Sequence, residues 1–274
     1  TTMPTGGFSP AARSIEAFSA TAQWIIIPFM FLAGTNFALL WRSFTGRPRT
    51  LFNDPEFRTY LGIIFVFSAL LFVVLVFEQQ MYFTEAGIRH SLFQTLSIIT
   101  TTGYASVDFA RWSSLSITIL FLAMFIGGCA GSTGGGPKVI RWLVSVKSVF
   151  REMYNTIHPK VVKPVRFGKK VIDEDNIRQI TMLILFYLFL FLMGTFLLEV
   201  DAVWFAAERN TLDVMSTVAA CIGNIGPGFG IVGPMNNFLS YSIFSKSVLI
   251  FLMWIGRLEI FTVFVLFLPA YWKN

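Results

Sequence analysis

The chain has 274 residues, of which 55% are hydrophobic and 13% are charged. Soluble domains carry roughly 25% charged residues, so this deficit excludes a disordered chain, a fibrous protein and most ordinary soluble enzymes. The composition predicts an all-α polytopic membrane protein. The net charge of +6 does not indicate nucleic acid, because the basic residues fall between apolar runs, as they do in cytoplasmic loops.

Five apolar segments are candidate membrane spans. Tyr60–Phe77 and Gln179–Leu198 contain 18 and 20 residues without a charge, enough to cross about 30 Å of hydrocarbon. Three other apolar segments are longer but contain charged residues: Ser14–Trp41, Ser113–Leu143 and Tyr241–Trp272. As helices they would extend about 42 to 48 Å at about 1.5 Å per residue, so they must tilt, break or protrude.

Charge predicts the orientation of these spans. Arg42–Arg58 holds four basic residues and Lys138–Arg178 holds ten. Gln80–Trp112 holds two arginines, and Glu199–Leu239 holds one. By the positive-inside rule the first two segments are cytoplasmic and the last two external. The pattern predicts five crossings.

Both external segments contain a short helical pattern. Thr84–Thr100 and Asn210–Cys221 have apolar residues at helical spacing, and Thr84 and Asn210 suit the N-cap position. Each segment is too short to span, and each ends in a glycine-containing run. We expect re-entrant half-helices that return as extended backbone, which is tolerated at membrane depth only where it lines water or is buried in protein.

A repeat follows from this order of elements. A span, a half-helix, a glycine-containing loop and a long span occur at Tyr60–Leu143 and again at Ile177–Trp272, and Thr1–Trp41 supplies the loop and final span of another copy.

Each copy has one loop with a glycine near its centre. Potassium must shed its water, so a selective pore offers carbonyl oxygens and threonine hydroxyls. Glycine lets successive carbonyls face one axis, and the negative ends of half-helices point toward it. We therefore predict a K⁺ selectivity filter in which Gly6, Gly103 and Gly226 are equivalent. Its residues, and the expected K⁺ ligands, are Pro4, Thr5 and Gly6; Thr101, Thr102, Gly103 and Tyr104; and Asn224, Ile225 and Gly226.

The number of loops indicates how many pore repeats this sequence contains. Four loops are needed to enclose an ion, and this chain has three, or about 2.5 of four repeats. The chain also begins at Thr1 with a polar, glycine-rich stretch that does not resemble a signal peptide. We expect one repeat and the front of another to precede it.

The segment from Gly127 to Pro137 interrupts a long span with six glycines and a proline. In a helix these would cost about 1 kcal/mol per glycine and about 3 for the proline, so the helix should break. The freed backbone groups then need water or protein, which a pore provides. The predicted gate residues are Gly127, Gly128, Gly131, Ser132, Thr133, Gly134, Gly135 and Gly136.

Arg257 lies deep in the last span. A charge near the bilayer centre costs about 2.5 kcal/mol or more, so it should face a partner or the pore. Below the filter it would repel K⁺. We predict that Arg257 is an electrostatic barrier and part of the gate.

Four sequence segments resemble the Trk/Ktr/HKT superfamily of potassium transporters. They are Thr-Met-Pro-Thr-Gly-Gly-Phe-Ser, Thr-Thr-Thr-Gly-Tyr-Ala-Ser, Gly-Gly-Cys-Ala-Gly-Ser-Thr-Gly-Gly-Gly-Pro-Lys and Ile-Gly-Asn-Ile-Gly-Pro-Gly-Phe-Gly. The resemblance implies M1–pore helix–M2 units around a pseudo-fourfold pore, an intramembrane loop in the third M2 and an arginine in the fourth. It also implies a homodimer in the bacterial inner membrane, gated by cytoplasmic nucleotide-binding TrkA-type regulatory subunits.

On this basis the chain divides as follows. Residues 1–41 hold the filter loop and M2 of the second repeat, 42–59 a cytoplasmic linker, 60–143 the third repeat, 144–176 a basic cytoplasmic loop and 177–274 the fourth repeat. Lysines at positions 160–170 make anionic membrane lipid a possible partner of the basic loop.

The expected function is potassium uptake through a gated filter, with no covalent catalysis and no organic cofactor. Transport is either channel-like or coupled to H⁺ or Na⁺ as symport. An alternative is the potassium-translocating subunit of an ATP-driven pump, whose ATP site would belong to a partner chain.

Overall fold

The computed structural model describes residues 1–46, 48–78, 84–161, 163–168, 170–204, 209–258 and 260–272. The described part is mainly helical. Its α-helices are α1 (Ala20–Ala33), α2 (Phe37–Phe44), α3 (Arg49–Asn53), α4 (Pro55–Phe77), α5 (Glu85–Ile99), α6 (Ser114–Ala123), α7 (Val139–Ile157), α8 (Glu174–Trp204), α9 (Thr211–Ile222), α10 (Ile243–Leu258) and α11 (Ile260–Val265). A two-stranded antiparallel hairpin pairs β1 (Arg166–Phe167) with β2 (Lys170–Val171). Short 3-10 turns are η1 (Ser14–Ala17), η2 (Phe109–Arg111), η3 (Gly230–Val232) and η4 (Pro269–Trp272).

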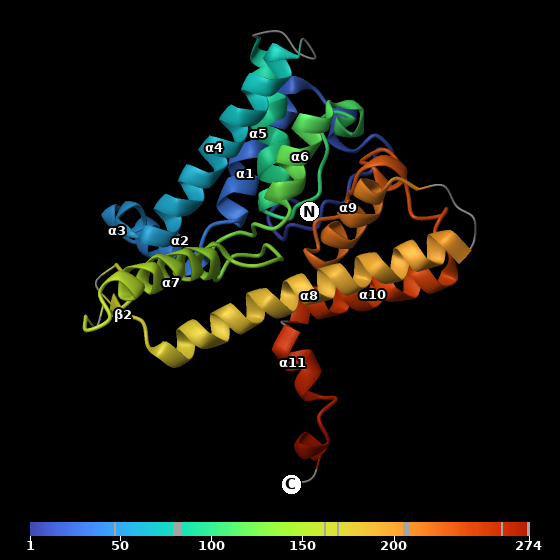
Figure 1. Cartoon of the computed structure of the whole chain (residues 1–274). Helices are drawn as coiled ribbons and strands as arrows, with labels where there is room; N and C mark the ends of the chain where they lie inside the picture. Colours follow the sequence, from blue (N-terminus) through green and yellow to red (C-terminus); the bar gives the residue numbers. More distant parts are fainter. Residues whose placement is uncertain are drawn as a thin grey trace.

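Two similar helical units make up most of the molecule. In one, α4 packs on α5 and α6; in the other, α8 packs on α9 and α10. Figure 1 shows the two units around a centre where the N terminus lies between α6 and α9, and α1 packs on α5. The order of long helix, short helix and second apolar helix is the same in both units, so the predicted internal repeat is confirmed.

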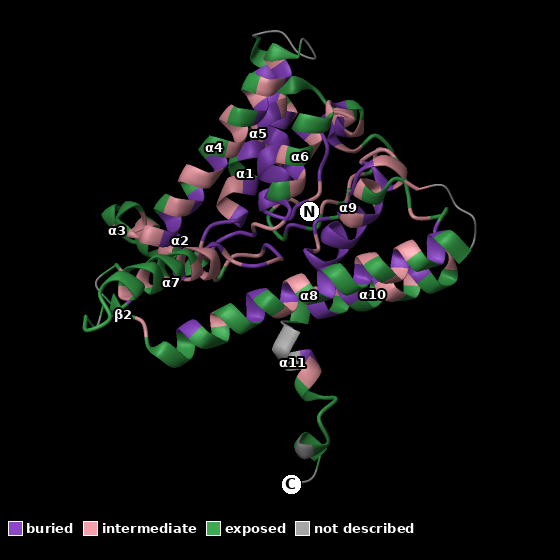
Figure 2. Ribbon diagram, in the orientation of Figure 1, coloured by how far each residue is buried: buried purple, intermediate pink, exposed green. Residues whose placement is uncertain are grey.

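The short helices α5 and α9 form the interior. Every residue from Phe93 to Ile99 and from Ser216 to Ile222 is buried, and Figure 2 shows both helices as largely buried ribbon. The long helices instead expose large apolar side chains such as Phe65 and Phe196, which are 71% and 63% exposed. Such an inside-out distribution is typical of helices that face lipid.

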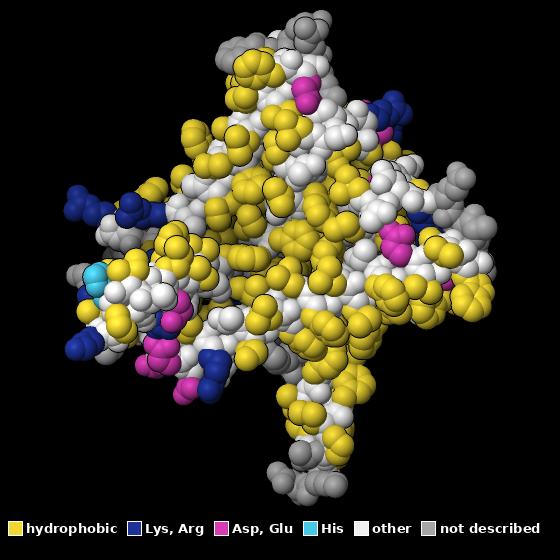
Figure 3. Space-filling model, in the orientation of Figure 1, with side chains coloured by type: hydrophobic (Ala, Val, Ile, Leu, Met, Phe, Trp, Pro, Cys, Tyr) yellow, Lys and Arg dark blue, Asp and Glu magenta, His cyan; other side chains and the backbone are white. Residues whose placement is uncertain are grey.

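The space-filling view agrees with the predicted orientation. Apolar side chains cover most of the visible face, and basic side chains gather toward the end of the molecule that carries α3 and the end of α7 (Figure 3). By the positive-inside rule this end faces the cytoplasm.

The long predicted spans are broken. Among the described residues, α4 and α8 are long and apolar enough to cross a membrane, and α1 with α2, bent by 104°, would be a third span. The other two predicted spans are divided between α6 and α7 and between α10 and α11. Glycine allows α4 to pack closely at the first of these breaks, because a Cβ on Gly34, where α1 ends, would lie 2.3 Å from the Tyr60 hydroxyl.

One predicted boundary is wrong. The sequence assigns residues 144–176 to a basic loop, but α7 continues to Ile157 and the hairpin follows. Basic residues interspersed along α7, at Arg141, Lys147 and Arg151, give this segment the composition of a basic loop. Its buried side, at Val144, packs with Val165 and Ile177 in a small separate cluster.

Candidate functional site

Three loops meet at the centre of the molecule: residues 1–8, 100–105 and 223–229. We call them the first, second and third re-entrant loops. The second and third follow the C-terminal ends of α5 and α9. In each loop one amide donates a hydrogen bond to the carbonyl five residues earlier. These bonds run from Gly6 to Thr1 (3.0 Å), from Thr102 to Ser97 (2.9 Å) and from Ile225 to Ala220 (2.8 Å).

The backbone dihedrals of the loops match in the same register. In each loop a non-glycine residue has a positive φ, and a glycine with positive φ stands two residues later. The pairs are Thr5 and Gly7 (51° and 64°), Thr101 and Gly103 (56° and 79°), and Asn224 and Gly226 (54° and 116°). A positive φ is the conformation that favours glycine.

These angles correct the predicted alignment of the first loop. Gly7, and not Gly6, is the structural equivalent of Gly103 and Gly226. Gly6 corresponds instead to Thr102 and Ile225, the residues between the two positive-φ positions. The sequence could not distinguish two adjacent glycines, because either one satisfies a search for a central glycine.

The glycines bring neighbouring loops into backbone contact. A Cβ on Gly7 would lie 2.0 Å from the carbonyl oxygen of Thr102, and a Cβ on Gly103 would lie 2.1 Å from that of Ile225. No side chain fits at either position. A cavity of about 440 Å³ lies against the glycine ends of the three loops, where Gly7, Gly103 and Gly226 are part of its lining.

The glycine-rich loop, residues 124–138, lies against the opposite ends of the re-entrant loops. Thr5 Oγ1 donates to the carbonyl of Thr133 (3.0 Å), and Thr101 Oγ1 accepts from the amide of Gly135 (2.6 Å). A Cβ on Gly135 would lie 2.5 Å from the carbonyl oxygen of Gly223 in the third loop. The glycine-rich loop therefore touches all three re-entrant loops. The helix breaks where the sequence predicts, since α6 ends at Ala123 and α7 begins at Val139.

Arg257, near the end of α10, reaches the same loop. Its Nη1 donates to the carbonyl of Thr133 (3.1 Å), the oxygen that also accepts from Thr5. A Cβ on the preceding Gly256 would lie 2.0 Å from the carbonyl oxygen of Ile222, so α10 packs directly on the end of α9. This close packing places Arg257 under the third loop.

A second cavity, of about 240 Å³, lies beside the glycine-rich loop. Lys138, Arg141 and Arg257 line it together with residues 132–136, and no acidic residue among the described ones lines it. Lys138 Nζ donates to the carbonyl of Gly134. Clustered positive charge on one wall opposes the entry of a cation.

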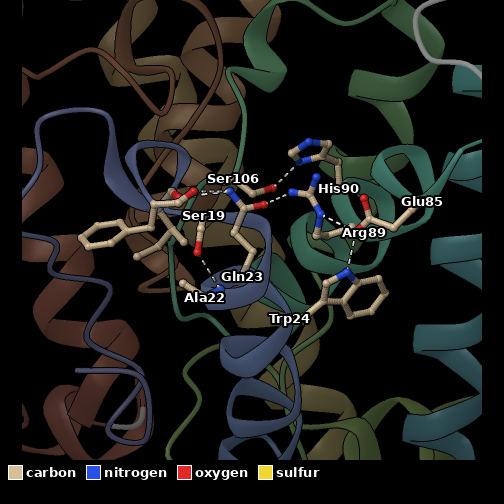
Figure 4. Close-up of polar contacts among 10 residues, drawn as sticks. Ser19, Ala22, Gln23, Trp24, Glu85, Arg89, His90 and Ser106 are labelled. Atoms are coloured by element: carbon tan, nitrogen blue, oxygen red, sulfur yellow. Dashed lines mark hydrogen bonds and ion pairs between the residues drawn. The ribbon is translucent and has the colours of Figure 1, made fainter.

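A polar network that the sequence did not reveal ties α5 to α1. Buried Arg89 donates to Gln23 Oε1 and, through Nε, to Glu85 (2.8 Å), and Trp24 Nε1 also donates to Glu85 (2.5 Å). Figure 4 shows these side chains converging between the two helices. Because the network fixes α5 to the preceding repeat, it holds the second re-entrant loop relative to the first.

The imidazole of His90 makes a separate contact next to this network. Its Nδ1 lies 2.8 Å from Ser106 Oγ (Figure 4).

Fold and site together define a polytopic membrane protein of repeated re-entrant units, whose loops meet backbone to backbone at one centre. A family profile described as "Cation transport protein" matches residues 1–274. The chain belongs to the TrkH family of cation transport proteins. With its apolar helices, this makes it a multi-pass protein of the bacterial inner membrane.

Relatives of known name support the assignment. The Trk system potassium uptake protein TrkH of Escherichia coli strain K12 is 34% identical over 275 residues, which cover 100% of this chain and 55% of that protein. The TrkH protein of Halomonas elongata is 35% identical over 279 residues, with 100% and 55% covered. The crystal structure of the potassium transporter TrkH from Vibrio parahaemolyticus matches with a TM-score of 0.89 and 33% identity, over 99% of this chain and 57% of that one. The chain spans a little over half the length of these relatives.

Proposed function

We propose that this protein takes up potassium across the bacterial inner membrane through a pore whose selectivity filter includes the three re-entrant loops. The observation that carries the proposal is the shared backbone pattern of these loops, which meet with glycine against carbonyl. Carbonyl and hydroxyl oxygens grouped in this way suit a dehydrated K⁺ ion, the transported substrate. The names of the relatives, which describe potassium uptake, agree with it.

The proposed filter keeps the residues chosen from the sequence, with Gly7 in place of Gly6 as the central glycine of the first loop. The proposed division of the chain into repeats is unchanged except that residues 144–157 extend the third M2. In a fourfold arrangement, a fourth loop from outside this chain would stand beside Gly226, where an added Cβ meets only the Gly103 Cα, at 3.7 Å.

The proposed gate is the glycine-rich loop together with Arg257. Two observations support this role. The glycine-rich loop contacts all three re-entrant loops, and the Arg257 guanidinium donates a hydrogen bond to it. A cation leaving the filter would meet Thr133 and then the positive wall of Lys138, Arg141 and Arg257. Movement of the loop would open the path, and removal of positive charge would lower the electrostatic barrier.

The proposed assembly follows the family. The protein would act as a homodimer, gated by cytoplasmic TrkA-type regulatory subunits, with anionic lipid at its basic cytoplasmic side, and it would carry out transport without covalent catalysis. Channel-like conduction and symport with H⁺ or Na⁺ both fit this site. The names of the relatives describe uptake systems and give no support to a pump subunit.

The test uses the full-length protein in proteoliposomes and compares two adjacent glycines. We expect Gly7→Ala to reduce Rb⁺ uptake by about tenfold or more, because its Cβ would collide with the Thr102 carbonyl at 2.0 Å and its φ is +64°. Gly6→Ala is the matched control. Its Cβ would meet the movable Phe8 ring at 3.2 Å and the Thr1 Cβ at an ordinary contact distance of 3.7 Å, so uptake should stay within about twofold of wild type.

Equal uptake by the two variants would contradict the corrected register. Gly103→Ser extends the test to ion choice, because its side chain would displace the Ile225 carbonyl, 2.1 Å from the Cβ position. We expect it to raise Na⁺ flux relative to Rb⁺. An unchanged ratio would refute the assignment of these loops as the filter.

A further inference from the structure

Glu56 is a buried carboxylate at the cytoplasmic start of α4. Only 4% of it is exposed. Its position is set by the preceding residues: Asp54 Oδ1 accepts from the amide of Phe57 (2.9 Å) as the N-cap, and Pro55 occupies the first turn. This capped turn directs the Glu56 side chain to one point, which is the base of the glycine-rich loop.

One oxygen of Glu56 holds both sides of that loop. Oε1 accepts from the amide of Ala130 (2.7 Å) and from the amide of Ile140 (3.2 Å), in the first turn of α7. Charge-assisted bonds of this kind are roughly twice as strong as neutral ones. A carboxylate is also favoured beside the positive N-terminal end of a helix such as α7.

The contact divides the glycine-rich loop into two limbs. The anchored limb, residues 129–131, is fixed outside the pore centre: the amide of Cys129 donates to Gly34 (2.8 Å), and the carbonyl of Gly131 accepts from Phe37 (3.2 Å). The inner limb, residues 133–136, makes the contacts with the re-entrant loops and Arg257. Gly131, with φ of +71°, lies at the junction.

We propose that Glu56 is the positioning residue of the gate: it holds the anchored limb of the glycine-rich loop against the first turn of α7. Three facts support it: its burial, its two bonds to opposite sides of the loop and its place two residues after Asp54, the N-cap of α4. The word gate rests on the proposed function, but the loop position itself can be measured without ion flux.

The native cysteines provide that measurement. Cys129 lies in the anchored limb and Cys221 in α9, and each is 1% exposed. The full-length protein in membrane vesicles is exposed on both sides to a charged methanethiosulfonate, and peptide mass spectrometry follows each cysteine separately. We expect Glu56→Ala to speed labelling of Cys129 about tenfold, the effect of losing bonds of about 1.4 kcal/mol, with Cys221 unchanged.

Two further variants make the result decisive. Glu56→Gln keeps an oxygen acceptor of the same shape, so Cys129 labelling should remain within about threefold of wild type. Asp175→Ala is the matched control, because its carboxylate is 80% exposed and pairs with Arg178 at the start of α8; it should change nothing. The proposal is overturned if Glu56→Ala labels at the wild-type rate, if Glu56→Gln labels as fast as Glu56→Ala, or if Cys221 labelling rises in parallel. An unchanged ratio of Na⁺ to Rb⁺ flux in the earlier Gly103→Ser test would refute the filter and leave this labelling pattern intact.

Discussion

The second span of one repeat is broken and that of the other runs unbroken to the pore centre. In the third repeat, α6 ends at Ala123 and residues 124–138 run as irregular backbone before α7. In the fourth repeat, α10 continues from Ile243 to Leu258. We call residues 114–157 the broken arm and α10 the unbroken arm. The two arms meet at the carbonyl oxygen of Thr133, which belongs to the broken arm and accepts a hydrogen bond from Arg257 of the unbroken arm.

The difference shows what each form of chain can contribute. An unbroken helix satisfies most of its own backbone groups, so α10 contributes little there: the Met253 carbonyl accepts from Asn224 Nδ2 (3.1 Å), and the Arg257 side chain donates to Thr133. The broken arm frees amides and carbonyls that must find partners, and they find them in the re-entrant loops and Glu56. The broken arm is therefore the one that can exchange partners and move.

The largest expected effect falls on the unbroken arm. Alanine normally favours a helix over glycine by about 1 kcal/mol, but Gly256→Ala would place Cβ 2.0 Å from the Ile222 carbonyl oxygen. We expect a loss of about 2 to 3 kcal/mol of stability, measured by thermal unfolding in detergent. Gly62→Ala in α4, with no neighbour within 4 Å, is the matched control and should be neutral or slightly stabilising.

The corresponding change in the broken arm should act on transport more than on stability. Gly135→Ala would place Cβ 2.5 Å from the Gly223 carbonyl oxygen, and an irregular loop can shift to relieve this contact. We expect about tenfold more resting Rb⁺ leak into proteoliposomes, with less than about 1 kcal/mol lost in unfolding. A stability loss as large as that of Gly256→Ala would show that the broken arm is as rigid as α10.

A smaller effect is expected from the charge on the unbroken arm. Arg257→Ala removes the bond to Thr133 and one of three positive charges beside the cavity, so resting Rb⁺ flux should rise about fivefold. Arg257→Lys keeps the positive charge, so its resting Rb⁺ flux should stay close to that of wild type. Arg111→Ala, at a side chain that is 85% exposed, should leave flux unchanged. Unaltered flux in Arg257→Ala would remove the barrier role.

The smallest effect concerns the Thr133 hydroxyl. This hydroxyl lies within hydrogen-bond distance of the carbonyls of Met3 (3.0 Å) and Ala33 (3.2 Å). The contacts of the proposed gate instead use the backbone carbonyl of Thr133. Thr133→Val should therefore cost about 1 kcal/mol of stability and change resting flux by no more than about twofold. A change as large as that of Gly135→Ala would assign the hydroxyl, and not the backbone, to the gate.

Much of the architecture follows from local sequence. The charge-free runs of α4 and α8, the short apolar helices α5 and α9 and the glycine break after α6 each have strong local signals, and the structure has all of them. Local signals fail where the outcome depends on a distant partner. The choice between Gly6 and Gly7 depends on the Thr102 carbonyl, and the need for glycine at Gly34 depends on the close approach of Tyr60.

Buried polar residues were the hardest to find. In the sequence Glu56 resembles an ordinary first-turn acid, which the helix dipole favours, and Arg89 resembles the surface partner of Glu85 four residues earlier. Their roles come from the amides of Ala130 and Ile140 and from Gln23, which are distant in the chain. Only tertiary structure brings these partners together.

The contact between neighbouring re-entrant loops has a direction. Gly7 presses on the carbonyl of Thr102, and Gly103 presses on that of Ile225, always from an earlier loop onto the next one in the chain. A side chain added to the first loop would therefore displace the second loop, and one added to the second loop would displace the third. Among the described residues, Gly226 has only the Gly103 Cα within 4 Å, and its φ of +116° by itself disfavours any other residue there. Mutations in these chemically similar loops should be felt downstream and not upstream.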